Sequence, residues 1–202
     1  MGADGETHQG IFDLSFLSSI PGMHIMAPKN KWELSDMLKF AIHLNAPIAI
    51  RYPRGEAYAG LKEFREPVCF GKSEWIYEES QVALLAVGSM VKTAEEIRKK
   101  LKENGHACSL VNVRFVKPAD EEMLRKAAAG HKLLVTLEEN VASGGYGERV
   151  RAFLDENEIK IRLHAVTIPD VYVEHGNVDL LKKEIGMDAE SIASNLEQIL
   201  AE

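Results

Sequence analysis

The strongest constraint on the fold is the apolar run Val82–Val87, which is followed by a helical pattern. Six consecutive apolar residues are typical of a strand buried on both faces of a parallel sheet. The pattern then alternates to the end of the chain, with expected strands at Cys108–Val113, Leu133–Leu137 and Ile161–Val166, and expected helices over residues 91–103, from Pro118, over Gly147–Leu154, and around 177–184 and 189–200. This alternation predicts an open α/β domain with a mostly parallel sheet.

A shorter series precedes this domain. Phe12–Leu17 suits a short helix, His24–Ala27 a strand, and Pro47–Tyr52 a second strand. Between the strands, Asn30 and Glu33 resemble a capping box at the start of a helix. A strand, a helix and a strand in this order predict a parallel pair with a right-handed crossover.

Residues 55–72 lose all periodicity and form the best candidate linker. We therefore expect one domain over residues 1–65, an incomplete α/β segment, and a second over residues 66–202, a complete α/β domain. Ser73–Tyr77 is expected to add an antiparallel strand at the edge of the second sheet.

Charge and composition exclude several classes of partner. The 31 acidic and 24 basic residues of the 202-residue chain give a net charge of −7, which argues against nucleic acid or an anionic membrane surface. Cys69 and Cys108 form no CxxC pair, and no apolar run approaches the roughly 18 residues of a membrane span. The N-terminus lacks the pattern of a signal peptide, so we expect a cytoplasmic protein.

Two loops carry side chains suited to chemistry. The first is Asp4-Gly-Glu-Thr-His8-Gln-Gly10, in which a histidine that can exchange protons near neutral pH lies among polar residues. The second is Arg51-Tyr-Pro-Arg54-Gly55, at the carboxyl end of a strand, where guanidinium groups suit phosphate or carboxylate. On residue types alone, the first could equally be a flexible end and the second an ordinary salt bridge between domains.

A third group, Glu138-Glu-Asn140 with Ser143-Gly-Gly-Tyr-Gly147, also follows a strand. Adjacent carboxylates could act as an acid–base pair or hold a metal, and glycines before a helix could bind phosphate. The sequence has neither GxGxxG nor GKS/GKT here, so we favour a structural reading, with glycines in a tight turn and acids at a domain contact. The histidines show no metal-ligand spacing, so no metal site is expected in the chain.

Taken together, the motifs resemble the C-terminal portion of the 1-deoxy-D-xylulose-5-phosphate synthase family, which are transketolase-like thiamine-diphosphate enzymes. Asp4–Ser15, Ile20–Pro28 and Arg51–Gly55 resemble the later part of its pyrimidine-binding domain. The segments that resemble its C-terminal domain are Val113–Pro118, Glu138–Gly145 and Ile168–Gly176.

The resemblance implies a reaction and roles for three residues. The family condenses pyruvate with glyceraldehyde 3-phosphate, releasing carbon dioxide and forming 1-deoxyxylulose 5-phosphate, an isoprenoid precursor. Thiamine diphosphate with Mg²⁺ supplies the carbanion chemistry. By resemblance, His8 faces the bound substrate, Asp4 holds substrate oxygens beside it, and Arg54 grips the phosphate of the aldehyde.

The resemblance also implies what lies outside the chain. The family's diphosphate and Mg²⁺ motif, and the glutamate that activates the cofactor, belong to an upstream region. We therefore expect a fragment of the synthase that binds no cofactor and is inactive alone, with the N-terminal cofactor-binding domain as its missing partner and a homodimer as the complete enzyme. Two alternatives are a subunit of a split transketolase-like enzyme that lacks the cofactor domain, and a non-catalytic module that binds a phosphosugar or a partner. If His8 and Arg54 share a pocket, they must lie at the same edge of the sheet.

Overall fold

The larger sheet contains five strands in the order β3-β5-β4-β7-β8. The computed structural model describes residue 2 and residues 5–201. The strands are β3 (Glu74–Tyr77), β4 (Val82–Ala86), β5 (Cys108–Asn112), β7 (Leu133–Val141) and β8 (Arg162–Ile168). β5, β4, β7 and β8 are parallel, whereas β3 pairs antiparallel with β5 at the edge. The predicted parallel sheet and its antiparallel edge strand are both confirmed.

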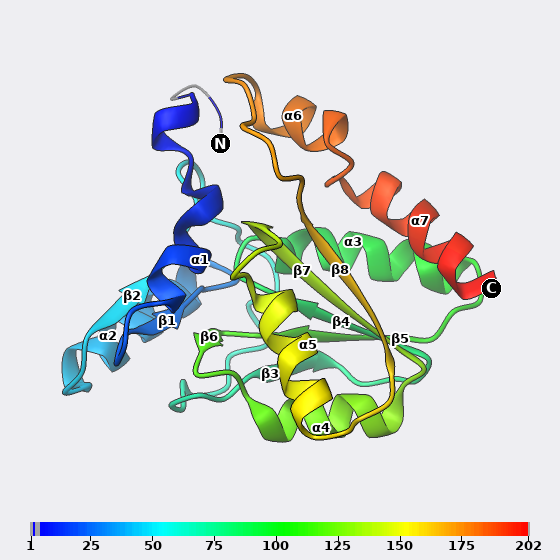
Figure 1. The fold of residues 1–202 in the computed structure, drawn as a ribbon, viewed down its shortest axis with the longest axis horizontal. Coiled ribbons are helices and arrows are strands. Elements are labelled where there is room, and N and C mark those ends of the chain that lie inside the picture. Colours follow the sequence, from blue (N-terminus) through cyan, green and yellow to red (C-terminus); the bar gives the residue numbers. More distant parts are fainter. Residues whose placement is uncertain (1, 3–4, 202) are drawn as a thin grey trace.

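Helices cover both faces of this sheet (Figure 1). Val82, Leu84 and Ala86 pack into one apolar cluster with α3 (Met90–Glu103) and α7 (Ala189–Ala201). Ala83 and Leu85 point to the other face and pack with α4 (Glu121–Gly130) and α5 (Tyr146–Glu156). All five residues of β4 are therefore buried, which explains why the sequence there is apolar without interruption.

A smaller sheet has the strand order β2-β1-β6. β1 (His24–Met26) and β2 (Ile48–Ile50) are parallel and are joined by α2 (Lys31–His43), as the β–α–β pattern predicts. The sequence did not predict β6 (Phe115–Lys117), which pairs antiparallel with β1. Because β6 follows β5 directly along the chain, it joins the smaller sheet to the larger one. β6 belongs to the expected second domain but pairs with a strand of the first, so the domain boundary between residues 65 and 66 remains a proposal.

The N-terminal turns pack against a segment near the C-terminus. These turns are η1 (Glu6–His8) and η2 (Gly10–Phe12), followed by α1 (Asp13–Ser18). Residues 169–177, here called the strap, connect β8 to α6 (Val178–Glu184). Gly176 N–H donates to Gly2 O at 3.2 Å, and the Gln9 side-chain amide donates to Val173 O. The two segments therefore lie side by side although they come from opposite ends of the chain (Figure 1).

Most predicted boundaries are shifted by one or two residues, and two are shifted further. The helix expected to open at Pro118 begins at Glu121, because the Asp120 carboxylate accepts the N–H of Met123 and caps the helix there. β7 continues past Leu137 to Val141, where it still pairs with Ile168 of β8. Within the described residues, no helix has both the length and the apolar character needed to cross a membrane.

Candidate functional site

The candidate site lies where several parallel strands end. Arg51 and Arg54 follow β2, Glu139 lies near the end of β7, and Ser89 precedes α3 just beyond β4. Ligands of open α/β sheets are bound at this carboxyl edge. His8, in η1, reaches the same edge from the N-terminal turns.

His8 and Arg54 line one cavity of about 290 Å³. Its other lining residues are Gly10, Ile11, Asp13, Arg51, Tyr52, Pro53, Ser89, Glu139 and Val178. The structure therefore brings together the histidine and the arginine that the sequence singled out, on one edge as expected. The third predicted residue, Asp4, lies outside the described residues.

Arg51 joins three elements at this cavity. Its Nη2 donates to the carbonyl of Gly10 at 3.1 Å and to the carbonyl of Glu139 at 2.8 Å. Its own N–H donates to Met26 O at 2.8 Å, which keeps Arg51 aligned with β1. The sequence showed Arg51 only as part of a basic motif and gave no sign of these contacts.

Glu139 is held as an ion at the wall of the cavity. Its carboxylate pairs with Lys182 of α6 and accepts the hydroxyl of Ser89. Burial alone would raise the pKa of Glu139, but the charges of Lys182 and Arg51 and the bonds from Lys182 and Ser89 outweigh it. The pKa of this carboxyl therefore lies below its usual value, and Glu139 stays charged.

Glu138, the residue directly before Glu139, has a different role. Its side chain is fully buried and accepts the N–H groups of Tyr146 and Gly147 at 2.7 and 2.8 Å, at the start of α5. Burial raises the pKa of Glu138 to about 7, against the opposing effect of those two N–H groups. The carboxyl group therefore caps a helix inside the protein.

The side-chain contact with the N-terminal segment, predicted for the two acids of this motif, is made by Asn140 instead. Its Oδ1 accepts the N–H of Leu14 at 3.1 Å, and its Nδ2 donates to the Ser15 hydroxyl at 2.7 Å. Gly144, with φ +72°, lies against Ser15, where a Cβ would be 3.1 Å from the serine Cβ. The motif 138–147 thus caps α5 and attaches α1 to the larger sheet.

A buried cluster of charges was missed from the sequence. Lys29 and Arg114 each pair with both Glu33 and Glu74, and the four side chains are at most 3% exposed. Two positive and two negative charges make the cluster neutral, as buried charges require. Burial alone would raise the pKa of Glu74, but the bond from Lys29 and the charge of Arg114 lower it below its usual value.

The cluster was not predicted because the sequence pattern assigned Glu33 to a capping box. As predicted, Asn30 caps α2 by accepting the N–H of Glu33 at 2.9 Å. The Glu33 carboxylate, however, does not complete a capping box with Asn30. It bonds to the backbone N–H and the ammonium group of Lys29, and to Arg114. The only sequence signal was that these charges lie beside strand and helix ends, which is too common to single them out.

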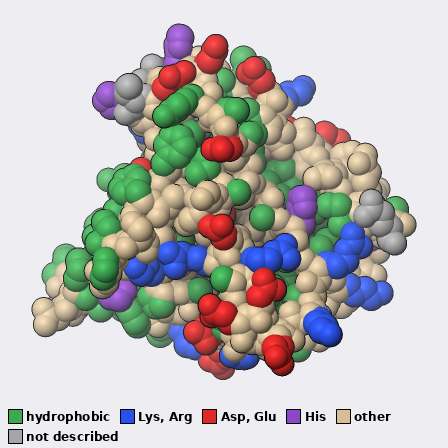
Figure 2. All heavy atoms as spheres, in the orientation of Figure 1, with side chains coloured by type: hydrophobic (Ala, Val, Ile, Leu, Met, Phe, Trp, Pro, Cys, Tyr) green, Lys and Arg blue, Asp and Glu red, His purple; other side chains and the backbone are tan. Residues whose placement is uncertain are grey.

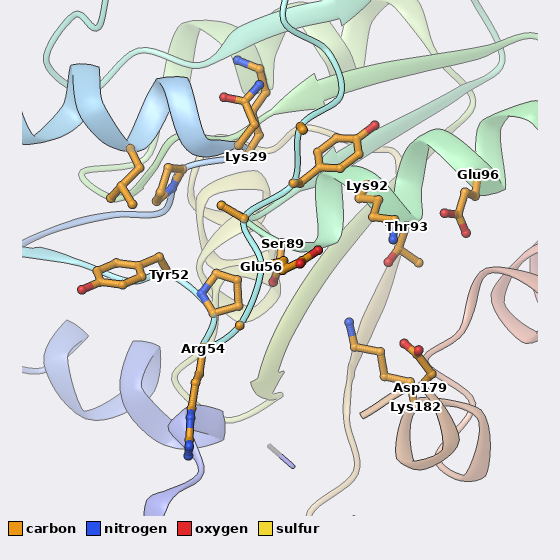
Figure 3. Close-up of a pocket in the computed structure, with 18 of the residues that line it drawn as sticks. Lys29, Tyr52, Arg54, Glu56, Ser89, Lys92, Thr93, Glu96, Asp179 and Lys182 are labelled. Carbon is orange, nitrogen blue, oxygen red and sulfur yellow. The ribbon is translucent and has the colours of Figure 1, made fainter. Parts of the chain in front are cut away.

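A larger cavity of about 740 Å³ adjoins the first and shares Tyr52, Pro53, Arg54 and Ser89 with it. Its charged lining residues have both signs: Lys29, Arg54, Glu56, Lys92, Glu96, Asp179, Lys182 and Asp188. In Figure 3 the Arg54 side chain extends away from Lys92 and Thr93, toward the N-terminal turns. The guanidinium group of Arg54 therefore lies on the side of the cavity that His8 lines. Among the described residues, no group of three or more His, Cys, Asp or Glu side chains could hold a metal ion.

Comparison with known families divides the chain in two. Residues 1–59 match the transketolase pyrimidine-binding domain, and residues 71–192 match the transketolase C-terminal domain. The large parallel sheet lies in the second match, and η1, β1 and β2 lie in the first.

Curated relatives match nearly the whole chain. A 1-deoxy-D-xylulose-5-phosphate synthase from Lachnoclostridium phytofermentans is 49% identical over 197 residues, which is 97% of this chain and 32% of that protein. The corresponding protein from Alkaliphilus oremlandii is 41% identical over 199 residues, 98% of this chain and 32% of its own length. The chain therefore spans about a third of the length of these relatives.

Two solved structures have the same fold. A split-gene transketolase, described as an inactive beta4 tetramer, has a TM-score of 0.86 and 27% identity, and covers 99% of this chain and 64% of its own. A transketolase from Campylobacter jejuni has a TM-score of 0.73 and 20% identity, over 98% of this chain and 29% of its own. The sequence matches, the α/β topology and the shared fold lead to one conclusion: this chain belongs to the transketolase family, with a pyrimidine-binding segment followed by a transketolase C-terminal domain.

Proposed function

We propose that this chain is the acceptor-site portion of an enzyme that condenses pyruvate with glyceraldehyde 3-phosphate, giving 1-deoxyxylulose 5-phosphate and carbon dioxide. The observation that carries the proposal is the cavity shared by His8 and Arg54, in a chain that is 49% identical to a protein named for this synthesis. Both residues belong to motifs that resemble the synthase family. The product would serve isoprenoid precursor synthesis in the cytoplasm.

Each site residue has a role that fits its chemistry. Arg54 binds the phosphate of the aldehyde, because a planar guanidinium group matches two phosphate oxygens at once. His8 donates a hydrogen bond to the carbonyl oxygen of the aldehyde and gives it a proton as carbon–carbon bond formation places charge there. Asp4 holds the neighbouring hydroxyl groups of the substrate.

The cofactor belongs to another part of the enzyme. Thiamine diphosphate, when bound with Mg²⁺, supplies the carbanion chemistry. This chain corresponds to about a third of the length of the synthases that it resembles, 32% of the L. phytofermentans protein. We therefore propose that a region beyond this chain carries the cofactor, that the complete enzyme is a homodimer, and that the 202-residue chain alone does not turn over.

A second candidate is a subunit of a split enzyme. It is favoured by the likeness to the split-gene transketolase, which covers 99% of this chain at a TM-score of 0.86. In that case a separate polypeptide would carry the cofactor region, and the two chains would form a stable complex. Co-expression of this chain with the remaining portion of the L. phytofermentans relative, followed by affinity purification, tests whether two such chains can form a stable complex. Failure of the two folded chains to associate would contradict the split-enzyme candidate.

The reaction itself is tested with a chimera, in which this chain replaces the 197 matching residues of the L. phytofermentans relative. With thiamine diphosphate, Mg²⁺, pyruvate and glyceraldehyde 3-phosphate, we expect the chimera to form 1-deoxyxylulose 5-phosphate. His8→Ala in the chimera should lower kcat by about 10²-fold or more, as expected when an acid–base group is lost. A folded chimera that forms no product while the parent relative does would refute the proposal.

A further inference from the structure

We propose that Arg51 is a positioning residue, which fixes the backbone at Gly10 and thereby directs the His8 side chain into the 290 Å³ cavity. The inference rests on the proposed function, in which His8 faces the substrate. It goes beyond that function because it gives a role to the arginine that does not bind the substrate.

The contacts of Arg51 bridge two parts of the chain. One terminal nitrogen, Nη2, donates to Gly10 O at 3.1 Å and to Glu139 O at 2.8 Å. Both N–H groups of this nitrogen are thus directed at backbone carbonyls. The planar guanidinium group holds its N–H groups in a fixed geometry, which a lysine ammonium group on a flexible stem cannot reproduce. Arg51 therefore fixes the distance between the N-terminal turns and the end of β7.

The anchor on β7 is itself rigid. The Glu139 carboxylate pairs with Lys182 of α6 and accepts the hydroxyl of Ser89. Residue 139 is consequently tied to α6 and to the start of α3, as well as to its neighbouring strand. A carbonyl held in this way gives Arg51 a fixed point from which to place Gly10.

The residues that follow His8 are held by two separate elements. The Gln9 side chain, 7% exposed, donates to Val173 O of the strap. The Gly10 carbonyl accepts from Arg51 and also from the N–H of Asp13. The strap therefore holds residue 9 and Arg51 holds residue 10, so the backbone directly after His8 is fixed, and with it the point from which the His8 side chain extends toward the cavity. A displacement of about 1 Å in such a group can lower a rate by about 10²-fold.

The test uses the 202-residue chain and three variants. Arg51→Lys keeps the positive charge but loses the planar guanidinium group, and Arg51→Met loses both. Arg65→Lys is the matched control, because Arg65 binds Asp36 through two nitrogens on an exposed surface outside the cavity. NMR measures the His8 ring signals and the amide exchange rate of Asp13, which reports on the Gly10 carbonyl. Titration with inorganic phosphate measures anion binding by the cavity.

If Arg51 positions His8, both Arg51 variants move the His8 ring signals, and Asp13 exchanges at least about tenfold faster. Arg51→Lys should keep the phosphate affinity within about threefold, because the charge remains. Arg65→Lys should match the wild type in all three measurements. Unfolding of Arg51→Met would leave Arg51→Lys to decide the question.

Wild-type His8 signals and wild-type Asp13 exchange in Arg51→Lys would overturn the inference. If this variant also lost tenfold or more of its phosphate affinity, Arg51 would instead be a ligand-binding residue. If the wild-type chain does not bind phosphate, the proposed role of Arg54 fails, while the His8 and Asp13 measurements still decide the role of Arg51.

Discussion

Glu138 and Glu139 show how neighbouring residues of one type take different roles. Successive side chains of a strand point to opposite faces, so Glu138 lies buried at the start of α5 while Glu139 reaches the cavity and Lys182. The sequence predicted that the motif is structural. It could not assign the two carboxylates, because the ion pair with Lys182 depends on how α6 packs, 43 residues further along the chain than Glu139.

The raised pKa of Glu138 predicts a pH dependence of stability. The folded state has a pKa of about 7 at this residue, against 4.5 as the ordinary value, so the folded state holds the proton more tightly. This contribution to the free energy of unfolding is largest below pH 4.5 and falls as the pH rises to about 7, by at most about 1.4 kcal/mol per pH unit.

Glu138→Gln removes this titration but keeps an oxygen that accepts one of the N–H groups of α5. We expect the variant to lose less stability than the wild type between about pH 5 and pH 7. Urea unfolding at several pH values in this range measures the difference. Parallel curves for the two proteins would show that Glu138 has an ordinary pKa in the folded protein.

Among the elements, α5 and β7 meet so closely that only glycine fits at residue 147. A Cβ at Gly147 would lie 2.7 Å from Thr136 Oγ1 and 3.0 Å from the Cβ of Ala165, both of which belong to the sheet. Gly147→Ala should therefore destabilise the protein by about 1–3 kcal/mol, although alanine favours a helix. Gly130→Ala is the matched control in α4, since no atom lies within 4 Å of the added Cβ. Thermal unfolding of both variants measures the contrast, and equal effects would contradict the close packing.

The buried charges join α2, β3 and the turn before β6. Glu33→Gln leaves Lys29 and Arg114 with one carboxylate between them, so we expect a loss of about 3–5 kcal/mol. Glu78→Gln, which breaks the exposed pair with Lys126, should cost less than about 1 kcal/mol. Denaturant unfolding compares the two variants. A loss of less than about 1 kcal/mol in Glu33→Gln would mean that water reaches the cluster in the folded protein.

Most elements could be predicted from sequence because their patterns are local. Val82–Val87 and the apolar residues of α3 show burial by composition and spacing alone. β6 could not be predicted, because its three residues form a strand only by pairing with β1, some 90 residues earlier in the chain. The same holds for Arg51, whose two carbonyl partners come from separate elements.

For the whole molecule, the two matched segments form one continuous structure around the cavity. His8, Arg51 and Arg54 come from the first segment, and Ser89 and Glu139 come from the second. The family resemblance implied that His8 and Arg54 act on one substrate, and both line the same cavity. Arg54 follows β2, at the carboxyl edge where ligands of such sheets are bound. The second segment does more than support the fold, since it supplies part of the cavity wall and anchors Arg51.

The central claim is that this cavity binds the phosphorylated aldehyde. The most direct test is to measure the dissociation constants of D-glyceraldehyde 3-phosphate and of D-glyceraldehyde for the 202-residue chain by isothermal titration calorimetry. We predict that the phosphorylated aldehyde binds at least about tenfold more tightly, and that Arg54→Met abolishes this difference while Arg65→Met leaves it unchanged. Equal affinity for the two aldehydes, or a preference for the phosphate that survives Arg54→Met, would contradict the account.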